Sequence, residues 1–405
     1  MGDIYQSSII ATFHRLDRER PADVEAELKK MSKYRSLALT LPALFSEFEG
    51  DALPGIVESL KGASYLDQIV LVLGGADQDQ YLFAREFMSQ LPQKLEVLWV
   101  DSPRIQAVIR RIEEQELFVG EDGKGRSVWL SYGYILGLGK ADVISLHDCD
   151  ILTYDRQMLA RLVYPVMNPY LSYEFAKGYY ARVSDRTIYG RVTRLFVTPL
   201  IRALTRLAGP QPFLTYLDDF RYPLSGEFAM NVDLARLNRV PAGWGLEVGT
   251  LAEIYRNVNP KRICQVDLAD SYDHKHQPLS PDDPKKGLLK MCMHIAQSIF
   301  HTLASEGVQF CEEFFRSLKV SYLRYAQDTI VKFAGDAAVN GLKYDRHAEG
   351  LAVETFANGL QMGGEEFLLN PTGGAQIPNW SRVAAAIPNI HEQLVEAVSR
   401  DEEEL

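Results

Sequence analysis

The sequence has 405 residues, of which 46% are hydrophobic and 24% are charged, a composition typical of a globular protein with a sizeable core. Lys and Arg number 43 against 54 Asp and Glu, which gives a formal net charge of −11. This acidic balance argues against a general nucleic-acid binder, because such proteins present a basic face. It leaves room for a local basic pocket that binds a small phosphorylated molecule.

No run of about 18 apolar residues is present, so a membrane partner is not expected. The N-terminal residues do not resemble a secretory signal. The four cysteines form no CxxC pair, which argues against a zinc ribbon or a disulfide scaffold. We therefore expect a protein of the reducing cytoplasm.

The first half of the chain alternates apolar runs with amphipathic segments. Strands are predicted at 36–41, 67–73, 95–100 and 142–147, the first of them ending at Pro42. Helices are predicted at 22–33, 52–62, 78–91, 104–116 and 125–138. Val-, Ile- and Leu-rich strands separated by helices indicate βαβ units and an α/β fold with a mostly parallel sheet. Ligands of such sheets bind beyond the carboxyl ends of the strands.

The second half is more mixed and then becomes helical. Between 155 and 280 we predict helices at 186–207 and 247–257 and a strand at 263–268. Further helices are predicted at 285–304, 308–335, 349–358 and 389–400, followed by a frayed acidic end at 401–404. This pattern predicts an N-terminal segment (1–35), an α/β domain (36–284) and a helical C-terminal extension (285–405), with the boundary near Pro281–Pro284.

Two carboxylates one residue apart, Asp148 and Asp150, directly follow the strand predicted at 142–147. Carboxylate oxygens suit a hard divalent cation, and such an ion can neutralise the diphosphate of a nucleotide. A polar turn at a strand end is the alternative explanation.

A Gly-rich segment, 120–126, precedes the helix predicted at 125–138 and contains Lys124 and Arg126. Glycines permit close approach of the backbone to a ligand, and the two cations suit phosphate at a helix N-terminus. The spacing is neither that of a Walker A loop nor that of a dinucleotide fingerprint. A flexible surface loop is the alternative.

Two other segments carry possible ligands. His274 lies in the run Asp273–His276 after a predicted strand and could complete a metal site, although a polar surface loop explains the run as well. The stretch 177–194 holds a local excess of cations that suits an anionic substrate, or else forms a solvated helix face. These cations are Lys177, Arg182, Arg186, Arg191 and Arg194.

Taken together, eight segments between Leu37 and Leu289 resemble, in order, motifs of the glucosyl-3-phosphoglycerate synthases, a retaining glycosyltransferase family with a GT-A fold. The helical C-terminus matches more loosely. The eight segments are 42–47 (PALFSE, family P-A-L-N-E-E), 73–77 (LGGAD, family D-S-G-S-T-D), 123–125 (GKG), 148–150 (DCD, family D-S-D), 190–193 (GRVT), 224–227 (LSGE, family L-G-G-E), 243–249 (GWGLEVG, family G-Y-G-V-E-I-G) and 273–279 (DHKHQPL, family E-H-R-N-R-P-L).

The resemblance implies roles for particular residues. Asp150 and His274 would bind a divalent cation, Mg or Mn, with Asp148 against the ribose or the ion. Glu247 would lie near the sugar and the acceptor hydroxyl, so Glu247 and Asp150 are the residues expected to be catalytic. Nucleotide contacts would come from Pro42, Ala43, Leu44, Glu47, Gly75 and Lys124. Acceptor and sugar contacts would come from Gly190, Arg191, Thr193, Gly226, Glu227 and His276.

The resemblance also implies an activity, namely metal-dependent, retaining transfer of glucose from a nucleoside diphosphate glucose to the 2-hydroxyl of 3-phosphoglycerate. The product would feed compatible-solute or polysaccharide-precursor synthesis, and a homodimer is the expected assembly. The chain departs from the family pattern at Phe45-Ser46 in the nucleotide loop, at Leu73 in place of Asp, and at His276 in place of Asn.

Because of these departures, two alternatives within the class remain open: a mannosyl donor, and free glycerate as the acceptor. Outside the class, a sugar nucleotidyltransferase would use a similar sheet and metal but needs an N-terminal Gly-rich signature that is absent. Intact Asp150 and His274 argue against a non-catalytic nucleotide-sugar sensor.

Overall fold

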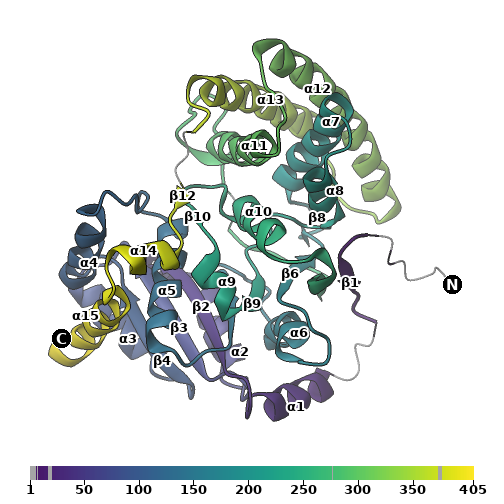
Figure 1. Ribbon diagram of the computed structural model, residues 1–405. Coiled ribbons are helices and arrows are strands. Elements are labelled where there is room, and N and C mark those ends of the chain that lie inside the picture. The colour runs from purple at the N-terminus through teal and green to yellow at the C-terminus, as the bar shows by residue number, and fades with distance from the viewer. Residues whose placement is uncertain (1–5, 7, 17–20, 276, 373–375) are drawn as a thin grey trace.

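The computed structural model describes residues 6, 8–16, 21–275, 277–372 and 376–405 (Figure 1). Its centre is a sheet whose eight strands lie in the order β1-β11-β6-β9-β5-β2-β3-β4. In that order the strands are Ala11–Phe13, Ile263–Ala269, Phe175–Tyr180, Phe228–Asn231, Val143–Leu146, Leu37–Leu44, Gln68–Gly74 and Lys94–Trp99. All neighbours pair in parallel except β9, which is antiparallel to both β5 and β6. The predicted mostly parallel α/β sheet is confirmed.

The prediction that the first strand ends at Pro42 is wrong, because β2 continues through Pro42 to Leu44. Strand β5 pairs only with residues 37 to 40 of β2, whereas β3 pairs as far as Leu44. From Pro42 onward β2 therefore has a single neighbour. A strand edge tolerates the missing N–H of proline.

Helices cover both faces of the sheet, as side-chain alternation along the strands requires. Ile69, Leu71 and Leu73 of β3 belong to the core shared with α1 (Pro21–Met31), α2 (Ala52–Leu60), α3 (Gln78–Met88) and α6 (Arg156–Met167). Val70 and Val72 face the opposite core, with α4 (Pro103–Glu113), α5 (Lys124–Leu138) and α9 (Val232–Leu237).

The helix predicted at 186–207 begins later than expected. Residues 183–188 form a hairpin, β7 (Val183–Ser184) and β8 (Thr187–Ile188), whose two turn residues, Asp185 and Arg186, have positive φ. A π-helix, η2 (Val192–Val197), then leads into α7 (Thr198–Ala208). The Asp-Arg turn lacks the glycine or asparagine that marks a two-residue hairpin in a sequence. The sequence pattern therefore did not predict this hairpin.

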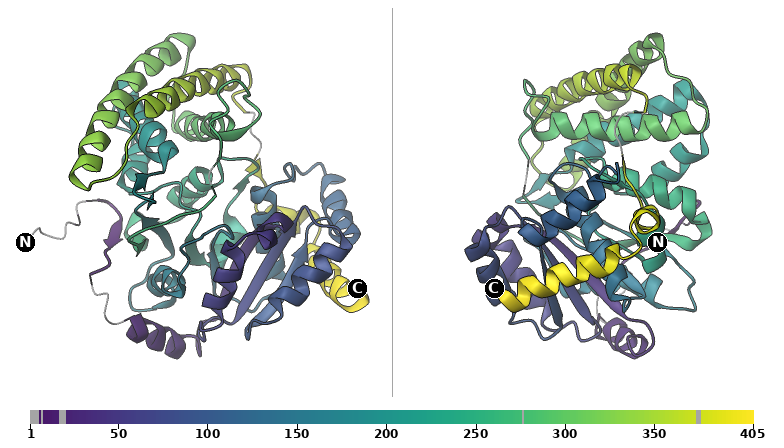
Figure 2. Two further views of the ribbon diagram at one scale, coloured as in Figure 1. Left: turned by 180° about the vertical axis from the view of Figure 1, so that it is seen from behind. Right: turned by 60° about the vertical axis from the view of Figure 1, so that its left-hand side comes forward.

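Residues after 285 form helices in two places (Figures 1 and 2). Helices α11 (Gly287–Ser305), α12 (Glu312–Val339) and α13 (Arg346–Leu369) pack together and on α7, with α8 (Pro212–Asp219) beside α7 and α10 (Leu246–Asn257) against α11. Helices α14 (Trp380–Ala386) and α15 (Ile390–Glu404) return to the sheet and cover α5 and α4, after a two-stranded pairing of β10 (Val240–Pro241) with β12 (Gln376–Ile377).

The acidic end is not a frayed tail, because α15 runs through Glu404. Asp401 is buried, and its Oδ1 lies 2.6 Å from Nη1 of Arg104 on α4, which also pairs with Glu404. The prediction of a solvated end is therefore wrong. Among the described helices, none is long and apolar enough to span a bilayer.

Candidate active site

The sequence-predicted residues gather where the parallel strands end. Strand order changes direction between β2 and β5, and the crevice beyond such a switch point is where ligands of open α/β sheets bind. Asp148 and Asp150 follow β5, and His274 follows β11. Because β9 is antiparallel, the segment that precedes it, Ser225–Glu227, comes to the same edge.

Lys124, the first residue of α5, joins two of the predicted motifs. Its Nζ lies 2.6 Å from Oδ1 of Asp148 and 3.1 Å from Oε1 of Glu247 at the start of α10. Burial opposes a charged lysine here, but the two carboxylates outweigh it and raise the pKa of Lys124. Burial likewise opposes a charged Asp148, but the Lys124 ammonium lowers the pKa of that carboxyl. Lys124 and Asp148 therefore both stay ionised at neutral pH.

Asp150 and His274 also lie together, although 124 residues separate them in the chain. Oδ2 of Asp150 is 3.7 Å from Nδ1 of His274, and Ile151 forms a β-bridge with His274. Burial, followed by repulsion from Asp148, raises the pKa of Asp150 to about 7. The cations near Asp150 therefore do not fully compensate its negative charge.

The imidazole of His274 is held in one tautomer. Its Nε2 lies 2.6 Å from Nη1 of Arg182, which has only protons to offer, so Nε2 accepts. Nδ1 is then protonated and donates to the carbonyl of Lys275, 2.6 Å away. Burial, and then the Arg182 charge, lower the pKa of His274. The ring is therefore neutral, but Arg182 occupies the lone pair of Nε2 and Nδ1 carries the proton, so His274 can bind a metal only after one of these two contacts is released.

The described residues include no cluster of three His, Cys, Asp or Glu side chains arranged to hold an ion unaided. Asp150 and His274 form a donor set of two. Mg²⁺ is usually bound by one or two carboxylates together with substrate phosphates, and imidazole suits transition metals. Asp150 thus fits a cation that a nucleotide diphosphate also binds, and His274 would join it once Nδ1 has lost its proton or Nε2 has lost its bond to Arg182.

Glu227 is buried at this edge, and its carboxylate accepts three hydrogen bonds from protein hydroxyls. Tyr180 donates to Oε2 at 2.8 Å, Tyr272 donates to Oε1 at 2.9 Å, and Ser225 donates to Oε2 at 2.9 Å. The two tyrosine rings stack with centroids 3.6 Å apart, and Tyr272 meets the ring of His274 edge-on at 5.6 Å. Glu227 thereby ties the loop before β9 to the loop that carries His274. The substrate contact implied for Glu227 stays a prediction.

The nucleotide-loop residues lie on the other side of the switch point. Pro42, Ala43 and Leu44 form the end of β2, Leu44 is exposed, and Glu47 lies in the 3₁₀ helix η1 (Phe45–Glu49). Oε1 of Glu47 is 3.5 Å from Nζ of Lys275 next to His274, so this loop borders the proposed metal site. Gly75, in the turn after β3, has a φ of +64° that favours glycine.

The acceptor motif begins at Gly190, whose φ is +73°. Arg191 is partly exposed and pairs with Glu349 of α13. Thr193 is buried in η2, and its Oγ1 has no hydrogen-bond partner among the described residues. His276, implied as another acceptor contact, lies outside the described residues.

The cations of 177–194 do not form a helix face. Lys177 is buried in β6, where Nζ donates to the carbonyl of Ser225 at 2.5 Å. Arg182 contacts His274, and Arg186 lies in the hairpin turn. Of the two cations in the Gly-rich segment, only Lys124 reaches the site, because Arg126 is buried against Asp122 and the carbonyl of Gly120.

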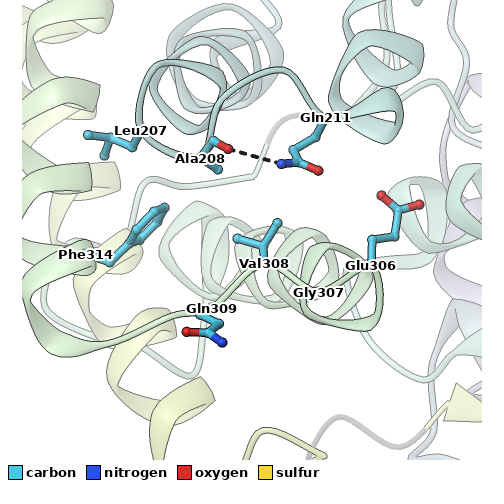
Figure 3. Close-up of a pocket in the computed structure, with 8 residues that line it drawn as sticks. All are labelled: Leu207, Ala208, Gln211, Glu306, Gly307, Val308, Gln309 and Phe314. Atoms are coloured by element: carbon cyan, nitrogen blue, oxygen red, sulfur yellow. Dashed lines mark hydrogen bonds between the residues drawn. The ribbon is translucent and has the colours of Figure 1, made fainter.

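Sequence reasoning noted Lys177 and Arg182 only as members of a basic stretch. It missed Tyr180, Tyr272 and Glu349, because a tyrosine in a strand, a tyrosine in a loop and a lone glutamate in a helix carry no local signal. A cavity of about 350 Å³ between α7, α8 and the turn after α11 contains none of the site residues (Figure 3). Gln211 and Glu306 are among its polar lining residues.

No protein-family model matches the sequence. The chain is 47% identical over 401 residues to a glucosyl-3-phosphoglycerate synthase of Persephonella marina, and the match covers 99% of both chains. The chain belongs to the glucosyl-3-phosphoglycerate synthase family. It is also 36% identical to the family member of Methanococcoides burtonii, over 99% of this chain and 98% of that one. The family assigned from the motifs is thus confirmed, and the chain is a glycosyltransferase.

Solved structures of the family agree with the fold. A Mycobacterium tuberculosis glucosyl-3-phosphoglycerate synthase, crystallised with Mn²⁺, UDP-glucose and phosphoglyceric acid, matches with a TM-score of 0.55 and 22% identity. The match covers 74% of this chain and 89% of that one. At this identity the likeness supports the GT-A type fold alone, and it confirms the fold class predicted from the sequence.

Proposed function

We propose that this member of the family transfers glucose from a nucleoside diphosphate glucose to the 2-hydroxyl of 3-phosphoglycerate, with retention of configuration and with a divalent cation. One observation carries the proposal: residues from four separate family motifs meet at one edge of the sheet. These residues are Lys124, Asp148, Asp150, Glu247 and His274.

The donor would bind in the crevice between the ends of β2 and β5. Pro42, Ala43, Leu44, Glu47 and Gly75 would contact the nucleotide, and Asp148 would lie near the ribose. The M. tuberculosis structures contain UDP or UDP-glucose, so UDP-glucose is the first donor to test. Leu73 replaces the family's Asp at this edge, and the choice of base is part of that test.

Asp150 and His274 would hold the cation, Mg or Mn. When bound, the ion would stabilise the negative charge of the departing diphosphate. Lys124 adds a fixed ammonium at the same edge, and pre-positioned charge stabilises a transition state without reorganisation. Its ion pairs with Asp148 and Glu247 fix where that charge lies.

The acceptor would be held by the motif at 190–193. Arg191 offers a guanidinium that can pair with phosphate through two parallel hydrogen bonds. Oγ1 of Thr193, which has no hydrogen-bond partner among the described residues, is a further polar group. Gly226, Glu227 and His276 are the other acceptor and sugar contacts in this proposal. A structure of the M. tuberculosis family member holds the product, glucosyl-3-phosphoglycerate, together with UDP and Mn²⁺.

The contacts of the carboxylates support the proposed retention. Asp148 and Asp150 are engaged with Lys124 and His274, and Glu247 is tied to Lys124. We assign no covalent nucleophile. The acceptor hydroxyl would attack on the face of the leaving group, where the departing phosphate takes its proton, and Glu247 would position sugar or acceptor hydroxyls.

A mannosyl donor or free glycerate as acceptor is the second candidate, because Leu73 in place of the family's Asp leaves the choice of nucleotide open and His276 in place of its Asn leaves the acceptor open. Membership of the family argues against a sugar nucleotidyltransferase. Assembly as a homodimer, a cytoplasmic location and a role in compatible-solute synthesis remain predictions.

A matrix of donors and acceptors, read by release of nucleoside diphosphate, tests the proposal. UDP-, GDP- and ADP-glucose and GDP-mannose would each be combined with 3-phosphoglycerate and with glycerate. The proposal expects a glucose donor with 3-phosphoglycerate to be the fastest pair. A fastest pair containing mannose or glycerate would replace it with the second candidate. Release of pyrophosphate from a nucleoside triphosphate and a sugar 1-phosphate, tested as a separate pair, would indicate a nucleotidyltransferase.

A further inference from the structure

A carboxylate from the C-terminal helices lies beside the proposed acceptor motif. Glu349 is in the first turn of α13 and is almost completely buried. Its Oε1 accepts from Nε of Arg191 at 3.1 Å, and its Oε2 accepts from Nη1 of Arg194 at 2.8 Å. One carboxylate thus contacts two arginines that lie three residues apart. Both arginines are more than 150 residues from Glu349 in the sequence.

The two arginines differ in what they leave available. Arg194 is buried and fully engaged, because its other donors reach the carbonyls of Tyr189 and Ile188 and its guanidinium lies 4.6 Å from the ring centroid of Phe333. The side chain of Arg191 is 43% exposed. Within the part of the chain that the structure describes, Glu349 is the one side chain hydrogen-bonded to Arg191 and takes only Nε. The pKa of the nearby Asp345 is lowered by backbone hydrogen bonds and also by the Arg191 charge. Both terminal nitrogens of Arg191 remain available to a ligand.

The turn before α13 is itself fixed to the hairpin that precedes the acceptor motif. Nη2 of Arg186 donates to the carbonyl of Gly341 at 2.8 Å, and the amide of Lys343 donates to the carbonyl of Arg186 at 2.6 Å. Thr187 forms a β-bridge with Lys343. Helix α13 is therefore docked on the segment that leads into Gly190 and Arg191, and Glu349 cannot move independently of it.

We propose that Glu349 is a positioning residue of the acceptor site, which holds Arg191 by Nε so that its two terminal nitrogens face the acceptor's phosphate. This inference rests on the proposed function. A flexible arginine loses conformational freedom when it binds a ligand, and a side chain already held in its binding orientation avoids that cost.

The inference gives the C-terminal helices a part in acceptor recognition. A purely structural Glu349 would instead serve only to compensate the buried charge of Arg194. The two accounts differ in what happens to acceptor binding when Arg191 is already absent, because coupled residues give non-additive effects.

The test is a double-mutant cycle on the full-length protein with Glu349→Gln, Arg191→Ala and the double variant. Glu349→Gln should raise KM for 3-phosphoglycerate about tenfold, as expected for loss of a charge-assisted contact. KM for the sugar nucleotide should stay within about twofold. In the Arg191→Ala background, Glu349→Gln should have no further effect on KM for 3-phosphoglycerate. Glu354→Gln, on the exposed side of the same helix, removes the same charge and should change nothing.

Additive effects in the cycle, or equal losses for both substrates, would overturn the inference and leave Glu349 a structural residue. A lower KM for 3-phosphoglycerate in Glu349→Gln would also overturn it, because Glu349 would then compete with the phosphate for Arg191. If Glu349→Gln does not fold, Glu349→Asp keeps the charge beside Arg194 but shortens the reach, and should still raise KM selectively; an unchanged KM would overturn the inference.

Failure of the proposed function would look different, because the wild type would then release no nucleoside diphosphate with any acceptor. Calorimetric binding of 3-phosphoglycerate and of inorganic phosphate, without a donor, would still decide the inference. Weaker binding in Glu349→Gln and in Arg191→Ala, with no additivity, supports it. Unchanged binding in Glu349→Gln contradicts it.

Discussion

Gly226 lies so close to Asp148 that a methyl group at position 226 would overlap the carboxylate. A Cβ there would lie 2.7 Å from Cγ of Asp148 and closer still to Oδ2. Asp148 is held from its other side by Lys124. The loop before β9 therefore packs directly against the carboxylate that is proposed to contact the donor. Position 226 has space for glycine but not for a residue with a Cβ.

Gly226→Ala should consequently displace Asp148 and disturb its ion pair with Lys124. A misplacement of about 1 Å in a site that positions reactants can cost about 100-fold in rate, so we expect at least that loss in kcat/KM. Gly335→Ala is the control, since a Cβ at that position on α12 meets nothing within 4 Å. A Gly226→Ala enzyme with near-normal kcat/KM would show that the position of Asp148 does not matter.

The buried Lys177 should make the free energy of unfolding depend on pH in the alkaline range. Burial lowers its pKa to about 8, against about 10.4 in an unfolded chain. Between these values the folded state has lost the proton and the unfolded state keeps it, so the free energy of unfolding rises with pH. Below about pH 8 the lysine is charged in both states, and the cost of burying that charge is fully present.

Replacement of Lys177 by Met removes this titration. Wild-type stability minus that of Lys177→Met should rise by up to roughly 3 kcal/mol from pH 7 to pH 10.5. Urea unfolding at several pH values measures both proteins, and other titrating groups cancel in the difference. A flat difference would mean that the ammonium keeps its ordinary pKa through its bond to the Ser225 carbonyl.

Asp150 and His274 should share one cation in the proposed site. Asp150→Ala and His274→Ala should each abolish turnover and weaken Mn²⁺ binding, measured by electron paramagnetic resonance in the presence of UDP. Lys275→Ala serves as a nearby control that removes no proposed ligand. Chelation should inactivate the wild type, and added Mn²⁺ should restore it. Normal Mn²⁺ affinity in either alanine variant would disprove the shared site.

Glu227→Gln should destabilise the protein as well as impair it. The amide has one acceptor oxygen in place of two, so the hydroxyls of Tyr180, Tyr272 and Ser225 cannot all keep their bonds. Hydrogen bonds to a charged group contribute about 1.5–3 kcal/mol each, and we expect a loss of that size in urea unfolding. If Glu227→Gln is as stable as the wild type but inactive, Glu227 acts on a substrate instead.

Much of the fold could be predicted because the apolar runs of β2, β3, β4 and β5 are buried on both faces, and turn residues separate them from amphipathic helices. Strand β9 was missed because its four residues, Phe228–Asn231, are too short to show a period. The hairpin at 183–188 was missed because its second turn residue is Arg186, where a two-residue turn with positive φ usually has glycine.

The candidate site likewise contains residues that the sequence predicted and residues that only the structure revealed. Asp148, Asp150 and Lys124 were found because they occupy motif positions beside strong elements. Contacts such as those of Lys177 with Ser225, or of Arg191 with Glu349, depend on packing between segments 48 and 158 residues apart. No local pattern encodes these contacts, so only the structure reveals them.

Proton NMR of the product is the most direct test of the account. Purified protein, UDP-glucose, 3-phosphoglycerate and Mn²⁺ should give a glucosyl-3-phosphoglycerate whose small anomeric coupling constant marks an α linkage to the 2-oxygen. No modified Glu247 peptide should appear in mass spectra of the reacting enzyme. A β-linked product, or attachment of glucose at another position, would contradict the account.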